Sequence, residues 1–341
     1  MAVLGASGGG KSVLQNISFI NSTTWSPAQD MHCKIYVVGG GGSGGAGQYI
    51  ATGGGAGGCA VTTADLDAST TYTITIGVGG LPVVHGPSNG NAGNNTTFSG
   101  TGISTMTGSA GQAGLYSTSS GGAKTGGAGG AASGGTYGNF TGGAGGATSG
   151  SGAAYMVTGG GAVGLWDTGT SAPGVAGSAA ASTDTTMFLS AGGYTIAAGS
   201  GASVGGTFLT RYHSATGTAD LDDVVRHPVG GFLSLIAGGQ GMDTDPQLYQ
   251  SSYAALPMGV GGPYRYQTSA TASIIGQQAG AFAGSGGVFS GTVAGYWGVS
   301  GPAGIGGGGG GVINYANQTN ADSKSGQGGV GCVLIEVLEY K

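Results

Sequence analysis

The stretch HCKIYVVGGGGSGGAG, residues 32–47, decides the fold, because a strand pattern runs without a break into a glycine tract. Residues 32–38 are rich in β-branched and aromatic side chains, which are typical of β-strands. Seven of the next nine residues are glycine, and a second tract, GGGAGG, follows at 53–58. The sequence therefore predicts a strand that continues as an extended segment almost free of side chains.

Glycine recurs at every third residue in these tracts. One row is Gly301, Gly304, Gly307 and Gly310, and shorter rows are Gly39, Gly42 and Gly45, and Gly41, Gly44 and Gly47. A polyproline-II helix has three residues per turn, so such a row lines one edge of it and lets neighbouring helices approach. Buried backbone groups must be paired, so ordered tracts need hydrogen bonds between segments. We expect a stacked polyglycine-II body rather than a flexible linker.

Composition excludes several other classes of protein. Glycine makes up 84 of 341 residues, and only 21 residues are charged (8 Lys and Arg, 13 Asp and Glu). Glycine destabilises helices by about 1 kcal/mol per position relative to alanine, which excludes a helical bundle. Eight cations and a net charge of −5 argue against binding of nucleic acid through a basic patch. No run of apolar residues is long enough to predict membrane insertion.

Two further strands frame the glycine-rich part. In TYTITIGVGG, residues 71–80, Tyr72, Ile74, Ile76 and Val78 alternate with threonines, the period of a half-buried strand. The chain ends in GGVGCVLIEV, 328–337, with Val333, Ile335 and Val337 on one face. We expect strands 32–38 and 330–338 to pair in one sheet, because both adjoin glycine tracts.

The predicted fold is therefore all-β and irregular, with little helix. A small sheet formed by the chain ends carries stacked polyglycine-II segments and long loops. Residues 1–30 are interpreted as an N-terminal attachment segment and 31–341 as a single glycine-rich domain. Residues from about 165 to 300 are interpreted as an inserted variable loop region, because glycine is sparse over 181–260.

No motif predicts an enzyme, a cofactor or a metal site. GASGGGKS, residues 5–12, fits the phosphate-binding P-loop pattern, but only four residues precede it and no apolar strand or helix frames it. The four histidines are scattered and lack a nucleophile elbow. The three cysteines, Cys33, Cys59 and Cys332, form no CxxC and are expected to be free thiols.

Several elements in order resemble the glycine-rich domain of bacteriophage tail-fibre and tail-tip proteins. These are Trp25-Ser26-Pro27, the strand HCKIYVV, the tracts GGGGSGG and GGGAGG, TYTITIGVGG, and the closing GGVGCVLIEV. The resemblance spans nearly the whole chain from about residue 18, apart from 165–300. The style is similar to that of distal adhesins of T-even-like phage fibres, in which glycine-rich segments form the body and variable loops touch the host.

The resemblance implies a virion protein, located in the tail and synthesised in the host cytoplasm. It implies contacts with other tail proteins through the N-terminal segment and with a surface receptor, a polysaccharide or an outer-membrane protein. A homo-oligomer, a purely structural tail or decoration subunit, and an ice-binding protein are left open. Aromatic side chains give large contact area at low entropy cost, and the receptor-binding candidates are Tyr249, Tyr253, Tyr264, Tyr266, Tyr296 and Trp297.

Overall fold

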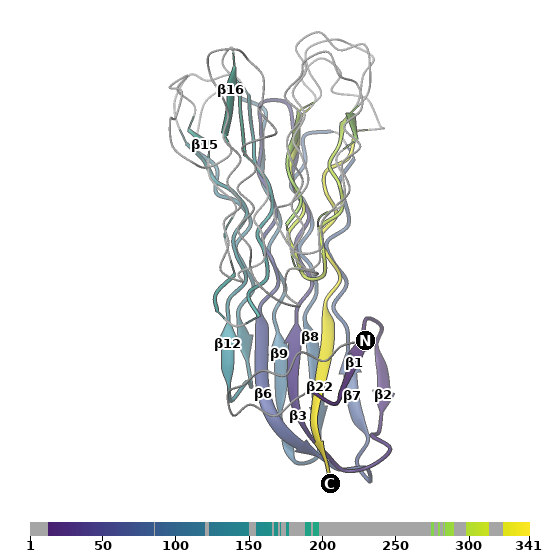
Figure 1. Cartoon of the computed structure of the whole chain (residues 1–341). Helices are drawn as coiled ribbons and strands as arrows, with labels where there is room; N and C mark the ends of the chain where they lie inside the picture. Colours follow the sequence, from purple (N-terminus) through teal and green to yellow (C-terminus); the bar gives the residue numbers. More distant parts are fainter. Residues whose placement is uncertain are drawn as a thin grey trace, which may run out of the picture.

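The molecule is elongated, with a β-sandwich at one end and long extended segments running towards the other (Figure 1). A computed structural model describes residues 13–84, 86–119, 123–149, 155–165, 167–169, 171, 175–176, 188–191, 194–197, 274–275, 279, 282, 284–289, 298–313 and 323–341. These residues form strands and extended segments and contain no helix. The predicted all-β, irregular fold is confirmed.

Two five-stranded antiparallel sheets make the sandwich. The first has the order β1 (Gln15–Phe19), β22 (Cys332–Tyr340), β3 (Met31–Val38), β6 (Cys59–Leu66) and β12 (Gly138–Phe140). The second has the order β2 (Thr23–Trp25), β7 (Tyr72–Thr75), β8 (Thr96–Gly100), β9 (Ile103–Gly108) and β11 (Ala132–Ser133). The predicted pairing of the end strands is confirmed, with Ile35 opposite Ile335.

The main core lies between the two sheets. Alternate side chains of β3 and β22 point into it, and Cys33, Ile35, Val333 and Val337 are fully buried. The second sheet adds Tyr72 and Phe98, whose rings stack at 5.4 Å between centroids. A smaller cluster covers the other face of the first sheet where its strands meet the glycine tracts, and includes Val38, Cys59, Val61, Val163 and Cys332.

Backbone hydrogen bonds between segments hold the glycine-rich body together. Eight consecutive N–H groups, Gly39 to Ala46, donate in strict rotation to three segments. Positions 39, 42 and 45 donate to 52–58, positions 40, 43 and 46 to 88–94, and positions 41 and 44 to 326–329. A period of three residues is that of a polyglycine-II helix, so the predicted packing is confirmed for this tract.

The carbonyl groups of residues 39–47 bind further segments of the body. They accept hydrogen bonds from Gly111 and Gly114, from Gly309 and Val312, and from Gly80. Residues 39–47 therefore have six neighbouring segments, three on the donor side and three on the acceptor side. Such close approach needs glycine: a Cβ atom on Gly41 would lie 2.0 Å from the carbonyl oxygen of Gly307.

Short strands continue the body beyond the sandwich, and several of them pair in parallel. Their bounds are β4 (Ala46–Gly47), β5 (Ile50–Ala51), β10 (Tyr116–Ser117), β13 (Thr148–Ser149), β14 (Tyr155–Val157), β15 (Val175–Ala176), β16 (Phe188–Ala191), β17 (Tyr194–Ala197), β18 (Ile274–Ile275), β19 (Val288–Phe289), β20 (Gly298–Val299) and β21 (Val312–Ile313). Strands β15 and β16 lie at the end of the molecule opposite the sandwich (Figure 1).

The period-two alternation in 71–80 holds through Ile76, but Val78 is 58% exposed, because β7 ends at Thr75 and the chain enters a three-residue repeat. Within residues 1–30, β1 pairs with β22 and β2 with β7, so residues 15–19 and 23–25 are strands of the sandwich. The role of the N-terminal segment in attachment stays a prediction.

Candidate functional site

The six receptor-binding candidates Tyr249, Tyr253, Tyr264, Tyr266, Tyr296 and Trp297 lie outside the described residues, as do residues 5–12 of the P-loop-like motif. The described strands β15 and β16 come from the predicted loop region, and they lie at the end of the body away from the sandwich (Figure 1). The ion pairs and cation–π contacts that the structure gives for the described residues lie on the sandwich.

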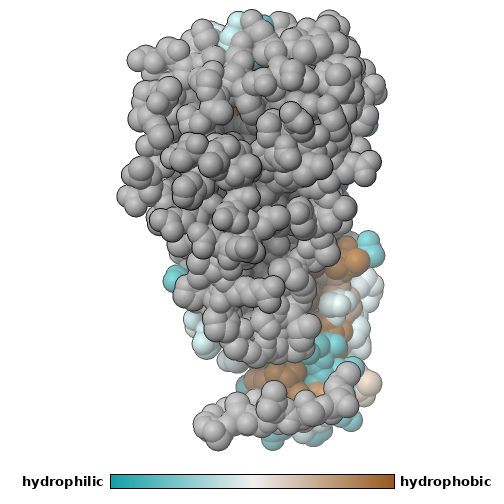
Figure 2. Space-filling model, turned by 45° about the horizontal axis from the view of Figure 1, so that its top comes forward, coloured by the Kyte–Doolittle hydropathy of each residue, from teal (hydrophilic) through white to brown (hydrophobic). Residues whose placement is uncertain are grey.

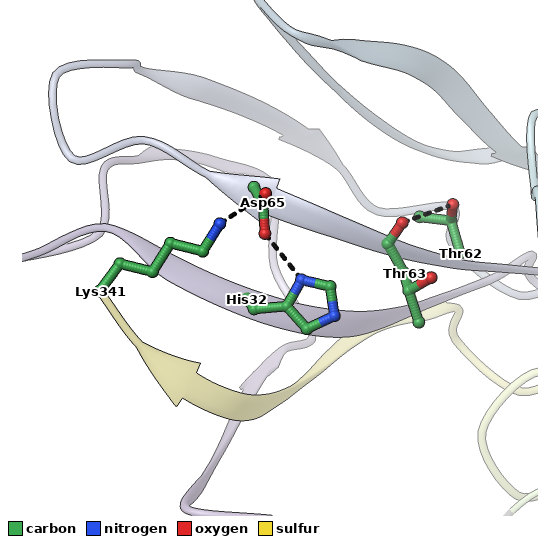
Figure 3. A network of polar contacts seen from close by, with 5 residues as sticks. All are labelled: His32, Thr62, Thr63, Asp65 and Lys341. Atoms are coloured by element: carbon green, nitrogen blue, oxygen red, sulfur yellow. Dashed lines mark hydrogen bonds and ion pairs between the residues drawn. The ribbon is translucent and has the colours of Figure 1, made fainter. Parts of the chain in front are cut away.

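A network of three polar side chains, His32, Asp65 and Lys341, lies at the end of the first sheet that is farther from the glycine body (Figure 3). His32 on β3 places Nδ1 2.7 Å from Oδ1 of Asp65 on β6, because the two residues are opposite each other in the strand register. The last residue, Lys341, places Nζ 2.6 Å from the other carboxylate oxygen. The hydrogen bonds from Lys341, and then from His32, lower the pKa of the Asp65 carboxyl below its ordinary value.

A second group lies on the outer face of the same sheet. The Lys34 ammonium sits 4.3 Å from the ring centroid of Tyr137 and 5.2 Å from that of Tyr36. The Tyr36 hydroxyl donates to the Glu336 carboxylate at 3.2 Å. Tyr137 is 61% exposed, which leaves one face of an aromatic side chain open beside a cation. Groups of this kind can hold a polar ligand at a surface, but they include no activated nucleophile.

The three cysteines are free thiols, as predicted, and all three are buried. Burial raises the pKa of the Cys33 and Cys59 thiols to about 12, and it raises that of Cys332 as well. A thiol acts as a nucleophile and metal ligand through its thiolate, so these side chains are inert core groups.

The described residues contain neither a metal-binding cluster nor a membrane-spanning helix. Over those residues, no three His, Cys, Asp or Glu side chains are grouped so that they could hold a metal ion. The same part of the chain contains no helix that is long and apolar enough to span a membrane.

The network around Asp65 was not predicted from the sequence. The register that brings His32, Asp65 and Lys341 together is set by strand pairing, which the sequence alone does not give.

The sandwich and the six-neighbour glycine tracts define a class: an all-β protein with a body built from polyglycine-II segments. The sequence model of the family described as the glycine-rich domain matches residues 17–231, more than half of the chain. The chain therefore belongs to the glycine-rich domain family. A search of curated proteins gives no match.

Proposed function

We propose that this chain is a non-enzymatic virion protein of a tailed bacteriophage, a tail-fibre or tail-tip adhesin that binds the host surface. One observation carries the proposal most: a hydrogen-bonded body separates the sandwich, which holds the first and last described strands, from β15 and β16 at the opposite end (Figure 1). Loops on a rigid scaffold are where binding residues concentrate. The likeness of the strand and glycine motifs to tail-fibre proteins supports the same role.

In this proposal the two ends have different tasks. The sandwich end attaches to other tail proteins, and residues 165–300 meet a polysaccharide or an outer-membrane protein. The body offers few side chains of its own, because most positions in its interior are glycine. Specificity must then come from segments rich in side chains, and the six aromatic candidates remain the residues proposed to make the contact.

The first experiment places the protein on the particle. An antibody against the chain, imaged by negative-stain microscopy on intact phage, is expected to label the tail tip or the distal end of a fibre. Labelling of the capsid, or no labelling of any particle, would overturn the proposal.

The second experiment separates an adhesin from a structural subunit. Residues 165–300 are exchanged for those of a related phage with another host, and adsorption and particle assembly are measured. A change of host range with normal assembly is expected. Unchanged adsorption with normal assembly would make the chain a structural tail or decoration subunit. Substituting Tyr264 and Tyr266 by alanine, with the exposed Tyr340→Ala on the sandwich as the control, tests the aromatic residues directly: weaker adsorption is expected for the first variant and unchanged adsorption for the control.

A further inference from the structure

Segment 88–94 of the glycine body, SNGNAGN, contains the only Asn-Gly pair in the sequence, Asn89-Gly90. In such a pair the backbone nitrogen of the glycine reaches the side-chain amide carbon of the asparagine easily, because glycine has no Cβ atom to hinder the approach. Asn89 is exposed, so water has access to its side chain. By its local chemistry, Asn89 is therefore the most reactive asparagine of the chain.

The fold itself requires this pair. A Cβ atom on Gly90 would lie 2.3 Å from the carbonyl oxygen of Ser43, a backbone atom of the six-neighbour tract 39–47. Glycine is thus imposed at position 90 by close packing. Asn89 also has a role in the body, because its Oδ1 accepts a hydrogen bond from the Tyr116 N–H at 3.3 Å. Packing and hydrogen bonding together build a reactive pair into the body.

In the docked segment the attacking nitrogen is occupied. The Gly90 N–H donates to the carbonyl group of Gly114 at 2.9 Å. This nitrogen must lose its proton to attack, and the hydrogen bond holds that proton in place. The Asn89 side chain is held as well, by the hydrogen bond from Tyr116. The reaction therefore requires the segment to leave its place in the body.

Backbone hydrogen bonds, rather than apolar contacts, dock the segment. Its side chains are those of serine, asparagine and alanine, in contrast to the hydrophobic patches that are visible near the sandwich (Figure 2). Segments with few buried apolar contacts open locally at a lower free energy than the core. The N–H groups that donate to the segment from tract 39–47 are those of Gly40, Ser43 and Ala46.

We propose that Asn89 is a site of spontaneous deamidation that is controlled by the docking of segment 88–94. When the segment opens, the Gly90 nitrogen loses its proton and bonds to Cγ of Asn89. The Cγ–Nδ2 bond breaks, and the amide nitrogen leaves as ammonia with that proton. Water then opens the resulting cyclic imide. Addition of water at Cγ gives aspartate, and addition at the backbone carbonyl carbon gives isoaspartate, in which the main chain runs through Cβ and Cγ.

The two products affect the body differently. Both add a negative charge, but isoaspartate also adds one carbon atom to the main chain between Ser88 and Asn91. These two residues accept hydrogen bonds from Ala46 and Ser43, which are likewise three residues apart. A lengthened connection cannot keep both pairings in register. The isoaspartate form therefore cannot redock fully, and a transient opening becomes a permanent one.

Peptide mass mapping after incubation of the full chain at mildly alkaline pH measures the reaction. A synthetic peptide of residues 86–95 gives the rate without protection, and Asn91 and Asn94 are internal controls. In the peptide, Asn89 should react first. In the folded chain its rate should be lower by about tenfold or more, because reaction occurs only from the open state. Equal rates in the peptide and the folded chain, or no preference for Asn89 in the peptide, would overturn the proposal.

Ser43→Ala tests whether docking controls the rate. The Ser43 hydroxyl accepts a hydrogen bond from the Asn91 N–H at 2.8 Å, so its removal should favour opening and speed the loss of Asn89 several-fold. Ser300→Ala is the matched control, because it removes another buried hydroxyl, which donates to Gly286. This control should leave the rate at Asn89 unchanged. No acceleration by Ser43→Ala, or equal acceleration by both variants, would contradict control by local docking.

Hydrogen exchange tests the permanent opening. The isoaspartate form is separated from the unmodified chain by anion exchange, and exchange of the amides in 88–94 is compared between the two. Asn89→Asp carries the same new charge on a backbone of normal length and is the matched control. Faster exchange is expected in the isoaspartate form and protection close to normal in Asn89→Asp. Normal protection in the isoaspartate form, or equal loss in both, would overturn the role of the added carbon.

Discussion

At the scale of single residues, Gly54 shows how closely the segments approach. A Cβ atom at this position would lie 2.2 Å from the carbonyl oxygen of Gly42, a backbone atom that cannot move aside without shifting a whole segment. Gly86 offers the opposite case, because a Cβ atom there would meet no atom within 4 Å. The two glycines therefore make a matched pair for substitution.

We predict that Gly54→Val destabilises the fold by about 3 kcal/mol or more, at the upper end of what overpacking costs. Gly86→Val should change the free energy of unfolding by less than about 0.5 kcal/mol, as is usual for surface sites. Urea denaturation followed by circular dichroism measures both values. Similar stabilities of the two variants would contradict a body held by close backbone contacts.

The Asp65 carboxylate gives a prediction with a defined pH dependence. Its pKa is lowered in the folded state, chiefly by the hydrogen bond from Lys341, so the ionised form favours folding. This stabilisation is present above the ordinary pKa of 3.8 and is lost as the pH falls through the lower folded-state value. Asp65→Asn should therefore lower the melting temperature at pH 7, and the difference from the unmodified chain should close as the pH falls below 3.8 and through the lowered folded-state pKa.

Lys341→Gln provides the control for this effect. If Lys341 acts through Asp65, the double variant should melt close to Asp65→Asn alone, because residues in one network are not additive. A difference between Asp65→Asn and the unmodified chain that is constant from pH 7 to pH 2 would argue against the ionic network.

At the scale of elements, the segment 71–84 shows what sequence can predict. The threonines at 71, 73 and 75 are exposed and Tyr72, Ile74 and Ile76 are buried, as the alternation predicts. After Ile76 the chain changes to a repeat of three, and the alternation therefore fails at Val78. Periodicity in the sequence identifies both the β-strand and the three-residue helix. The residue at which the strand changes into the helix depends on which neighbouring segments supply hydrogen bonds, and the sequence does not show this.

Neighbour relations are the part that sequence did not predict. The glycine rows indicate three-residue helices, but all such tracts look alike, so nothing in them tells that 39–47 contacts 88–94 or 326–329. The second sheet of the sandwich was missed for a related reason, since β8 and β9 lack a strong apolar alternation. The end strands were predictable because their aliphatic side chains are distinctive.

Proline provides a test of the extended elements. Ala128 is exposed, and among the described residues its N–H has no hydrogen-bond acceptor, while its carbonyl accepts from Gln112. Polyproline-II geometry suits proline, so Ala128→Pro should stabilise the fold by about 0.4–1 kcal/mol through the unfolded state. Gln112→Pro removes the N–H that donates to Ala128 and should destabilise it. Thermal melts of both variants give the comparison, and destabilisation by Ala128→Pro would contradict the assigned geometry.

At the scale of the whole molecule, the sandwich and the glycine body are continuous. β3 leads directly into 39–47, segment 53–58 leads into β6, and β22 follows 323–331. We predict that the two parts unfold in one transition. Scanning calorimetry should give a single endotherm, and Ile335→Ala in the sandwich, which should cost about 2–5 kcal/mol, should shift the same transition as Gly54→Val in the body. Two endotherms that respond separately would contradict this prediction.

The way the segments run also has a mechanical consequence. The backbone hydrogen bonds of the body and the sandwich lie across the strands, and the strands follow the long axis of the molecule (Figure 1). A load applied between the two ends pulls along that axis, so it shears many cross-links together instead of opening them one by one. Because β22 lies between β1 and β3, tension on the last strand is shared by its neighbours on both sides. Such a body should resist stretching far better than its modest number of side-chain contacts implies.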